Sequence, residues 1–152
     1  MVKEILIKRL SPEVNLPSFK SDGASGMDLE AFLKKEIIIK PGEYTLIPTG
    51  VAISMPEKCE AQIRPRSGLA SKNGVTVLNT PGTIDSDYRG EIKVILINFG
   101  NTNFIVKNKD RVAQIVFTKI EKPILKLTSN LSETKRNTGG FGSTGKWNEI
   151  FK

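Results

Sequence analysis

Short runs of β-branched residues, separated by turn-forming pairs, occupy most of the chain. The run at residues 36–40 reads Glu-Ile-Ile-Ile-Lys and is followed by Pro41-Gly42, and Thr49-Gly50 separates the next two runs. Runs of this length and spacing predict an all-β fold, either a sandwich or a barrel. The expected strands are residues 4–8, 36–40, 44–48, 51–55, 74–79, 91–99, 103–107, 111–118 and 123–128, with one helical turn at residues 67–72.

The last part of the chain has a different character. From Ser129 to Lys152 the apolar periodicity stops, and Gly, Ser, Thr and Asn dominate. Such a segment buries little surface by itself, so we expect a β domain over residues 1–128 and a flexible C-terminal arm over residues 129–152. The arm still carries Arg136, Phe141 and Trp147, which indicates ordering on a ligand or a neighbouring subunit.

The composition restricts the available chemistry. The chain has no histidine, so catalysis depends on Asp, Glu, Lys, Tyr, Ser or a hard metal ion held by oxygens. Its single cysteine, Cys59, excludes an intramolecular disulfide and a Cys-based zinc site. The 23 basic and 16 acidic residues give a net charge of +7, which suits an anionic ligand and is equally explained by solubility. The basic residues are spread thinly and form no polybasic nucleic-acid arm.

Two further patterns concern location. Charges are scattered through the apolar residues at the N-terminus, which argues against a signal peptide. No apolar run approaches the roughly 20 residues that span a bilayer. We therefore expect a soluble, cytoplasmic protein.

Residues 140–145 satisfy the G-x-G-x-x-G pattern and, with Lys146, most of a P-loop. Both motifs need a strand before them and a helix after them, and neither is expected here. A glycine-rich loop with Ser143, Thr144 and Arg136 nearby still offers backbone N–H groups and charge to a phosphate. A flexible linker is the alternative interpretation.

The densest group of polar side chains lies between residues 79 and 91, where Asp85, Asp87, Tyr88, Arg89 and Glu91 crowd one turn. A hairpin loop needs Pro, Gly and one Asp at most, so this density favours a functional loop.

Three other short patterns are ambiguous. Asp28 follows a turn glycine, Arg66-Ser67 follows a strand, and Gln114 lies within one. Each has a structural alternative. Asp28 could be a turn or cap residue, and Arg66-Ser67 could be a strand–turn junction. Gln114 could lie in a half-buried strand on which Arg111, Ala113 and Ile115 share one face.

Taken in order, these five segments resemble the trimeric dUTP pyrophosphatase family across essentially the whole chain. The matching residues are Ala24, Gly26, Asp28 and Leu29; Pro65, Arg66, Ser67 and Gly68; Asn79, Pro81, Gly82, Ile84, Asp85, Asp87, Tyr88, Arg89, Gly90 and Glu91; Arg111, Ala113 and Gln114; and Arg136 with Gly139–Gly145. Two residues depart from the family pattern. Lys109 and Asn137 stand where the family usually has glycine, and Asn tolerates positive φ better than most residues.

The resemblance implies a jelly-roll β-sandwich, a homotrimer with active sites between subunits, and Mg²⁺ as cofactor. It implies hydrolysis of dUTP to dUMP and pyrophosphate, which removes dUTP and supplies dUMP. The oxygen-preferring Mg²⁺ is compatible with a chain that has no histidine.

The family also implies roles for individual residues. Asp85 is expected to be the general base, and Asp28 to orient a metal-bound water. Tyr88 is expected to reject a 2′-hydroxyl, and Asn79 with the neighbouring strand backbone to read uracil. The phosphates are expected to be held by Arg66, Ser67, Gln114, Arg136, Ser143 and Thr144, Phe141 to stack on the base, and Gly68, Gly82, Ile84 and Gly142 to complete the substrate-binding set.

Two other functions remain open at this stage. A dCTP deaminase of the same fold would share the sandwich, although those enzymes lack a matching glycine-rich tail. A nucleotide-sensing binding module would retain the pocket without catalysis. A nucleic-acid binder is the least supported option.

Overall fold

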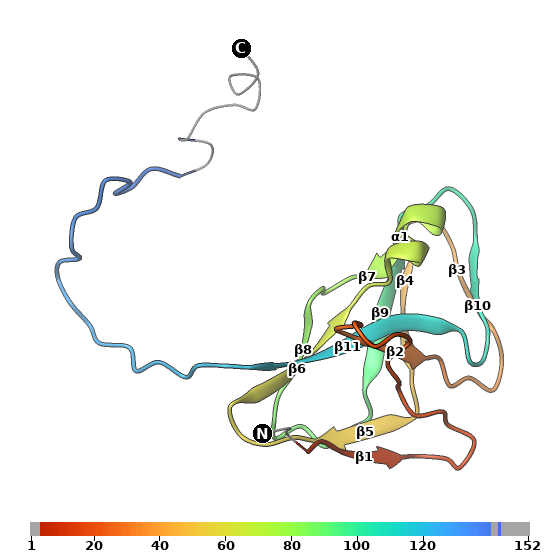
Figure 1. Cartoon of the computed structure of the whole chain (residues 1–152). Helices are drawn as coiled ribbons and strands as arrows, with labels where there is room; N and C mark the ends of the chain where they lie inside the picture. The colour runs from red at the N-terminus through yellow and green to blue at the C-terminus, as the bar shows by residue number, and fades with distance from the viewer. Residues whose placement is uncertain (1–3, 141–142, 144–152) are drawn as a thin grey trace. The chain divides into compact units, whose positions relative to one another are not determined.

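The structure is a computed structural model that describes residues 4–140 and residue 143 (Figure 1). The chain divides into two compact units, Met1–Lys122 and Pro123–Lys152. All the regular secondary structure in the described residues belongs to the first unit. The sequence instead predicts the arm to begin at Ser129, and that domain boundary stays a prediction.

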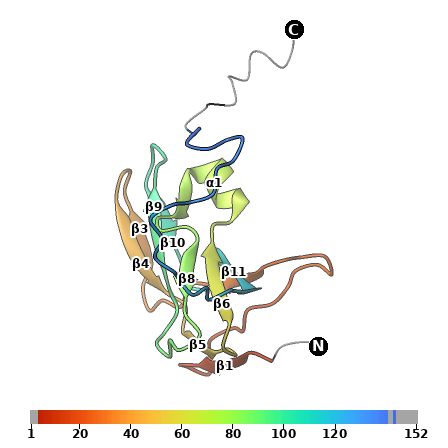
Figure 2. The ribbon, with the colours of Figure 1, turned by 90° about the vertical axis from the view of Figure 1, so that its left-hand side faces the viewer.

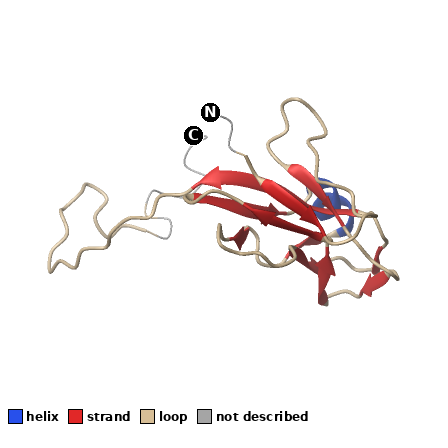
Figure 3. Cartoon of the chain, turned by 90° about the horizontal axis from the view of Figure 1, so that it is seen from below, coloured by secondary structure: helices blue, strands red, loops and turns tan. Residues whose placement is uncertain are grey.

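Eleven strands and one short helix make up the first unit, so the expected all-β class is confirmed (Figure 3). The elements are β1 Leu6–Arg9, β2 Met27–Glu30, β3 Ile37–Ile39, β4 Tyr44–Pro48, β5 Val51–Ser54, β6 Cys59–Arg64, α1 Ser67–Asn73, β7 Val75–Val77, β8 Gly82–Ile84, β9 Lys93–Asn98, β10 Phe104–Val106 and β11 Arg111–Lys119.

The strands form two larger sheets and two strand pairs, all with antiparallel neighbours. One sheet has the order β2-β11-β6-β8 and the other β4-β9-β7, while β1 pairs with β5 and β3 with β10. In Figure 2, β3, β4 and β9 lie in one layer and β6 and β11 in the other. This arrangement is a sandwich rather than a closed barrel.

Alternation along the strands builds the core between these layers. In β6 the side chains of Cys59, Ala61 and Ile63 are buried, while the residues between them are at least partly exposed. This period of two is what a strand with one buried face requires. The largest fully buried side chains are Leu29, Ile39, Ile47, Val51, Val75, Val77, Ile92, Val94, Leu96, Val106, Val112 and Ile115.

The strand predicted at residues 123–128 is wrong. No residue from 120 to 140 lies in a strand, and the side chains of Ile124, Leu125 and Leu127 are 96%, 92% and 99% exposed. The local pattern favours a strand, but the described part of the chain offers no neighbouring strand to complete its hydrogen bonds. Three observed strands, β2, β6 and β8, are missing from the list of expected strands, although Arg66-Ser67 is expected to follow a strand. Of these, β2 and β8 are short and are defined by pairing with β11 and β6.

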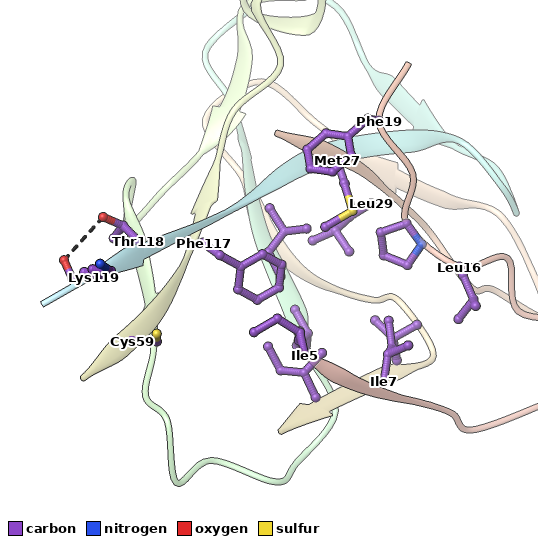
Figure 4. A pocket seen from close by; sticks show the side chains of 15 residues that line it. Ile5, Ile7, Leu16, Phe19, Met27, Leu29, Cys59, Phe117, Thr118 and Lys119 are labelled. Carbon is purple, nitrogen blue, oxygen red and sulfur yellow. Dashed lines mark hydrogen bonds between the residues drawn. The ribbon is translucent and has the colours of Figure 1, made fainter. Parts of the chain in front are cut away.

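An apolar groove of about 450 Å³ opens in the first unit beside β1, β2, β5 and β11. Figure 4 shows Ile5, Ile7, Leu16, Phe19 and Phe117 around it. Its lining is almost entirely aliphatic and aromatic, which makes it a poor match for a charged nucleotide.

No helix among the described residues has the length and apolar character needed to cross a bilayer. The cytoplasmic location stays a prediction.

Candidate active site

One cluster of charged side chains forms where β2 and β11 pair and β6 ends. Asp28 of β2 lies opposite Gln114 of β11. The Asp28 carboxylate accepts a hydrogen bond from Arg66 Nε at Oδ1 and another from Arg111 Nη1 at Oδ2, both at 3.1 Å. Arg66 Nη1 also donates to the Arg111 carbonyl oxygen at 3.1 Å, so the three residues form one network.

The charge balance of this cluster favours an anion. Its side chains are partly shielded, with exposures of 14% for Asp28, 26% for Arg66 and 47% for Arg111. Two guanidinium groups share one carboxylate, which leaves a net positive charge at the end of β6. Guanidinium N–H groups bind phosphate oxygens in the same planar geometry as carboxylates.

Gln114 connects this cluster to the turn before α1. Its Nε2 donates to the Pro65 carbonyl oxygen at 2.9 Å, which fixes the backbone next to Arg66. A Cβ atom on Gly26 would lie 2.5 Å from Gln114 Oε1, so a larger residue there would displace the glutamine. The structure thus brings together Asp28, Arg66 and Gln114, three of the residues predicted from the sequence.

Arg111 was not among the predicted site residues, and a bulge explains why. Strict alternation would place Arg111 on the face of Ala113 and Ile115. The β2–β11 register shifts between Arg111 and Ala113, so both Val112 and Ala113 are buried while Arg111 is exposed. The extra residue turns the Arg111 side chain toward Asp28. No pattern in the sequence alone reveals this bulge, although Arg111 is one of the residues that match the fourth family segment.

Ser67 and Gly68 lie directly beside the cluster, in the first turn of α1. Both are exposed, and a Cβ atom on Gly68 would meet nothing within 4 Å. No side chain caps this end of the helix. The backbone here is therefore accessible to a ligand bound at Arg66.

A second group of predicted residues lies in the segment between β7 and β9. Gly82 is buried, and a Cβ atom on it would lie 3.2 Å from Asn79 Nδ2 and 3.4 Å from Ile63 Cβ. Asp85 and Tyr88 follow β8, and the Tyr88 backbone N–H donates to the Asp85 carbonyl oxygen at 3.2 Å. These two residues line a hollow of about 470 Å³, whose complete lining is Leu46, Thr83, Ile84, Asp85, Tyr88, Glu91 and Lys93.

The two groups are far apart within one chain. In the β6–β8 ladder Ile84 pairs with Ala61, so Asp85 follows the end of the ladder that is farther from Arg66, roughly level with residue 60. Six residues separate that level from Arg66, which at roughly 3.3 Å per residue corresponds to about 20 Å. A single chain therefore does not bring Asp85 to the arginine cluster.

The arm contributes only part of its predicted set to the described residues. Arg136 Nε donates to the Gly139 carbonyl oxygen at 2.8 Å, and the Ser143 backbone N–H donates to Gly140 at 3.0 Å. Asn137 has a φ of 43°, so it adopts the positive φ expected of a residue in a glycine position. Phe141, Gly142 and Thr144 lie outside the described residues.

Comparison with known proteins identifies the family. The family model described as dUTPase matches residues 12–145. The chain belongs to the dUTPase family. A curated relative, the deoxyuridine 5′-triphosphate nucleotidohydrolase of Rickettsia prowazekii, is 55% identical over 143 residues, which cover 93% of this chain and 97% of that protein. The resemblance inferred from the five segments is confirmed.

Solved structures of dUTPases share the fold at lower identity. A point mutant of the dUTPase of Staphylococcus bacteriophage 80alpha, solved with dUpNHpp, matches with a TM-score of 0.85 and 23% identity, covering 94% of this chain and 99% of the other. The dUTPase of phage phi11 of S. aureus, described with a structural Mg(II) ion, matches with a TM-score of 0.77 and 21% identity, covering 86% and 99%. These matches support the jelly-roll-like β architecture of this dUTPase-family chain.

Proposed function

We infer that this protein is a dUTP diphosphatase, which hydrolyses dUTP to dUMP and pyrophosphate. The observation that carries the inference is a family match spanning residues 12–145, in which both the arginine cluster and the Asp85 loop are present. Relatives that share more than half of their residues with this chain carry the same activity in their names.

We propose that the arginine cluster holds the phosphate chain of the substrate. Arg66 would bind phosphate oxygens through N–H groups that Asp28 leaves free, with Ser67, Gly68 and Gln114 completing the contacts. Asp28 keeps the Arg66 side chain in place, because its Oδ1 binds Nε at 3.1 Å. A guanidinium that is oriented before substrate arrives stabilises the developing charge without reorganising. Arg136, Ser143 and Thr144 of the arm are proposed for the γ-phosphate.

The cluster is compatible with Mg²⁺ bound mainly by the substrate. Both Asp28 oxygens already accept guanidinium hydrogen bonds, and the described residues contain no group of three acidic, Cys or His side chains suited to a metal. Mg²⁺ keeps several waters and often binds through substrate phosphates, so a dedicated protein cage is not needed. Asp28 would then contact a metal-bound water through its remaining lone pairs. When bound, the ion would neutralise phosphate charge.

For the chemical step we propose Asp85 as the general base. Its carboxylate would take a proton from a water molecule whose oxygen forms the new bond to the α-phosphorus. The bond from the α-phosphorus to the bridging oxygen breaks, and pyrophosphate leaves. A carboxylate is a weak base, so its main contribution is to hold the water in line for attack.

Recognition of the nucleoside would come from the same loop. Asn79 and the adjacent strand backbone are proposed to match the O4 and N3–H groups of uracil, since cytosine would leave buried groups unpaired. Gly82 and Ile84 would pack against the base. Tyr88 would lie against the sugar and exclude a 2′-hydroxyl.

These roles require Asp85 and Arg66 in one site, and we therefore propose a homotrimer with active sites shared between subunits. The separation of about 20 Å between the two groups supports this arrangement, because strands advance only about 3.3 Å per residue.

The test of the activity is pyrophosphate release from dUTP, dCTP, dTTP and UTP measured side by side with Mg²⁺. We expect dUTP to be hydrolysed with a kcat/KM far above those of the other three. Ammonia release from dCTP would identify a deaminase instead, and tight dUTP binding without turnover would identify a sensing module.

A further inference from the structure

We propose that Glu91 is a positioning residue that holds the loop carrying Asp85 and Tyr88, and that it thereby sets the discrimination between dUTP and UTP. This inference rests on the proposed function. Glu91 lines the same hollow as Asp85 and Tyr88, and no substrate-binding role is assigned to it above.

The Glu91 carboxylate is engaged at both oxygens. Oε1 accepts the backbone N–H of Gly50 at 2.8 Å, and Oε2 lies 3.8 Å from Lys93 Nζ. The Glu91 side chain is 21% exposed, and the backbone N–H that it binds lies in the turn between β4 and β5. These contacts suit an anchor better than a base or a metal ligand.

The group that Glu91 binds is itself fixed. Gly50 has a φ of 69° in the turn between β4 and β5, and a Cβ atom there would collide with Val14 and press on Phe32. The same turn is joined to the start of β9 by two more hydrogen bonds. Thr49 Oγ1 donates to the Ile92 carbonyl oxygen at 2.6 Å, and the Ile92 N–H donates to Val51 at 2.8 Å. The loop is therefore anchored to a packed part of the fold.

Tyr88 is held by the backbone of Glu91. Its hydroxyl donates to the Glu91 carbonyl oxygen at 3.0 Å. The ring also lies so close to Gly90 that a Cβ atom there would be 2.5 Å from Tyr88 Cζ. Because the hydroxyl proton is used within the loop, Tyr88 presents a fixed ring to the sugar rather than a hydrogen-bond donor. A fixed ring rejects an extra hydroxyl more strongly than a mobile one, since it cannot move aside.

Substitutions at Glu91 separate positioning from chemistry. In Glu91→Gln the amide oxygen still accepts the Gly50 N–H, so the ratio of kcat/KM for dUTP to that for UTP should stay within about twofold of wild type. In Glu91→Ala the anchor is lost, and the ratio should fall about tenfold, as the loss of one hydrogen bond to a charged group allows. A folded Glu91→Gln protein without turnover would show that the carboxylate acts chemically and would overturn the proposal.

Asn108→Ala is the matched control, because Asn108 Oδ1 accepts the Leu33 N–H at 2.9 Å between two other loops. It should lower the Tm without changing the dUTP to UTP ratio. If Glu91→Ala does not fold, Tyr88→Phe decides, since it removes only the bond to the Glu91 carbonyl and should also reduce the ratio. If the ratio of kcat/KM for dUTP to that for UTP is unchanged in Tyr88→Phe, or in folded Glu91→Ala, the proposal is refuted. A wild-type protein that releases no pyrophosphate from dUTP instead refutes the proposed function.

Discussion

At the residue scale, the two halves of the proposed site differ in how they are supported. Asp28 is held by two arginines, whereas Asp85 is exposed in a turn and its carboxylate bonds to no other side chain among the described residues. A group that moves a proton must reach water and substrate, so an open carboxylate suits this role. Asp28 therefore orients other side chains, and Asp85 is the candidate general base.

Asp85→Asn should keep the fold and dUTP binding, because the amide has nearly the same volume as the carboxylate. Turnover should fall about 100-fold or more, as expected when a general base is removed. Single-turnover pyrophosphate release and a separate binding titration with dUpNHpp measure the two effects. Turnover near the wild-type value would remove Asp85 from the mechanism.

Lys109 is a second residue whose backbone conformation leads to a testable prediction about stability. It has a φ of 68° in the turn before β11, and its N–H donates to the Ala31 carbonyl oxygen at 2.8 Å. A left-handed conformation costs a residue with a Cβ atom about 1 kcal/mol. Lys109→Gly should therefore raise the free energy of unfolding by up to about 1 kcal/mol.

Urea unfolding at matched protein concentration measures this change, with kcat for dUTP as a check that the site is unaffected. Lys109→Ala is the control, because it removes the same charge and keeps the Cβ atom. Equal stability of the glycine and alanine variants would show that φ strain is not the cause of any change.

At the element scale, the sequence predicts the strands whose apolar pattern and flanking turns agree. Residues 36–40, 44–48 and 51–55 correspond to β3, β4 and β5, and Pro41-Gly42 and Thr49-Gly50 mark their ends. What the sequence misses depends on partners distant in the chain. β2 reads Met-Asp-Leu-Glu, which has little strand character until it pairs with β11, and residues 123–128 have strand character without a partner.

The residues of the candidate site divide in the same way, into those that the sequence predicts and those that depend on contacts distant in the chain. Asp28, Arg66 and Gln114 are predicted from the five segments, because the family resemblance fixes their order along the chain. Arg111 depends on the bulge in β11, and Glu91 depends on its contact with the turn between β4 and β5. Both involve contacts across more than 40 residues of sequence, which no local pattern encodes.

At the scale of the whole molecule, the proposed sharing of active sites between subunits predicts complementation between inactive chains if the arm of one chain closes over a site that takes Asp85 from another. A chain ending at Lys135 lacks Arg136 and the glycine-rich part of the arm, and the Asp85→Asn chain lacks the base, so each is expected to be inactive alone. After subunit exchange at equal amounts, about one quarter of the sites should combine an intact arm with an intact Asp85 if these come from different chains. Activity should return to about that fraction.

The control is the truncated chain mixed with a chain carrying both changes, which should stay inactive. Exchange itself is checked by mass spectrometry of mixed assemblies. Exchanged assemblies that remain inactive would mean that each site takes Asp85 and the arm from one chain. A Tm of the truncated chain close to that of the full-length protein would show that the arm serves activity rather than folding.

The separation of Asp85 from Arg66 also has a consequence for how activity depends on dilution. If no single chain holds a complete site, the number of sites is set by the law of mass action and not by the number of folded chains. Specific activity per chain would then fall steeply below the dissociation constant of the assembly, while the circular dichroism spectrum changes little if the separated subunits stay folded. Substrate that bridges two subunits would oppose this loss, because it binds only the assembled form. In that sense dUTP would act on the protein as a cross-linker before it is consumed.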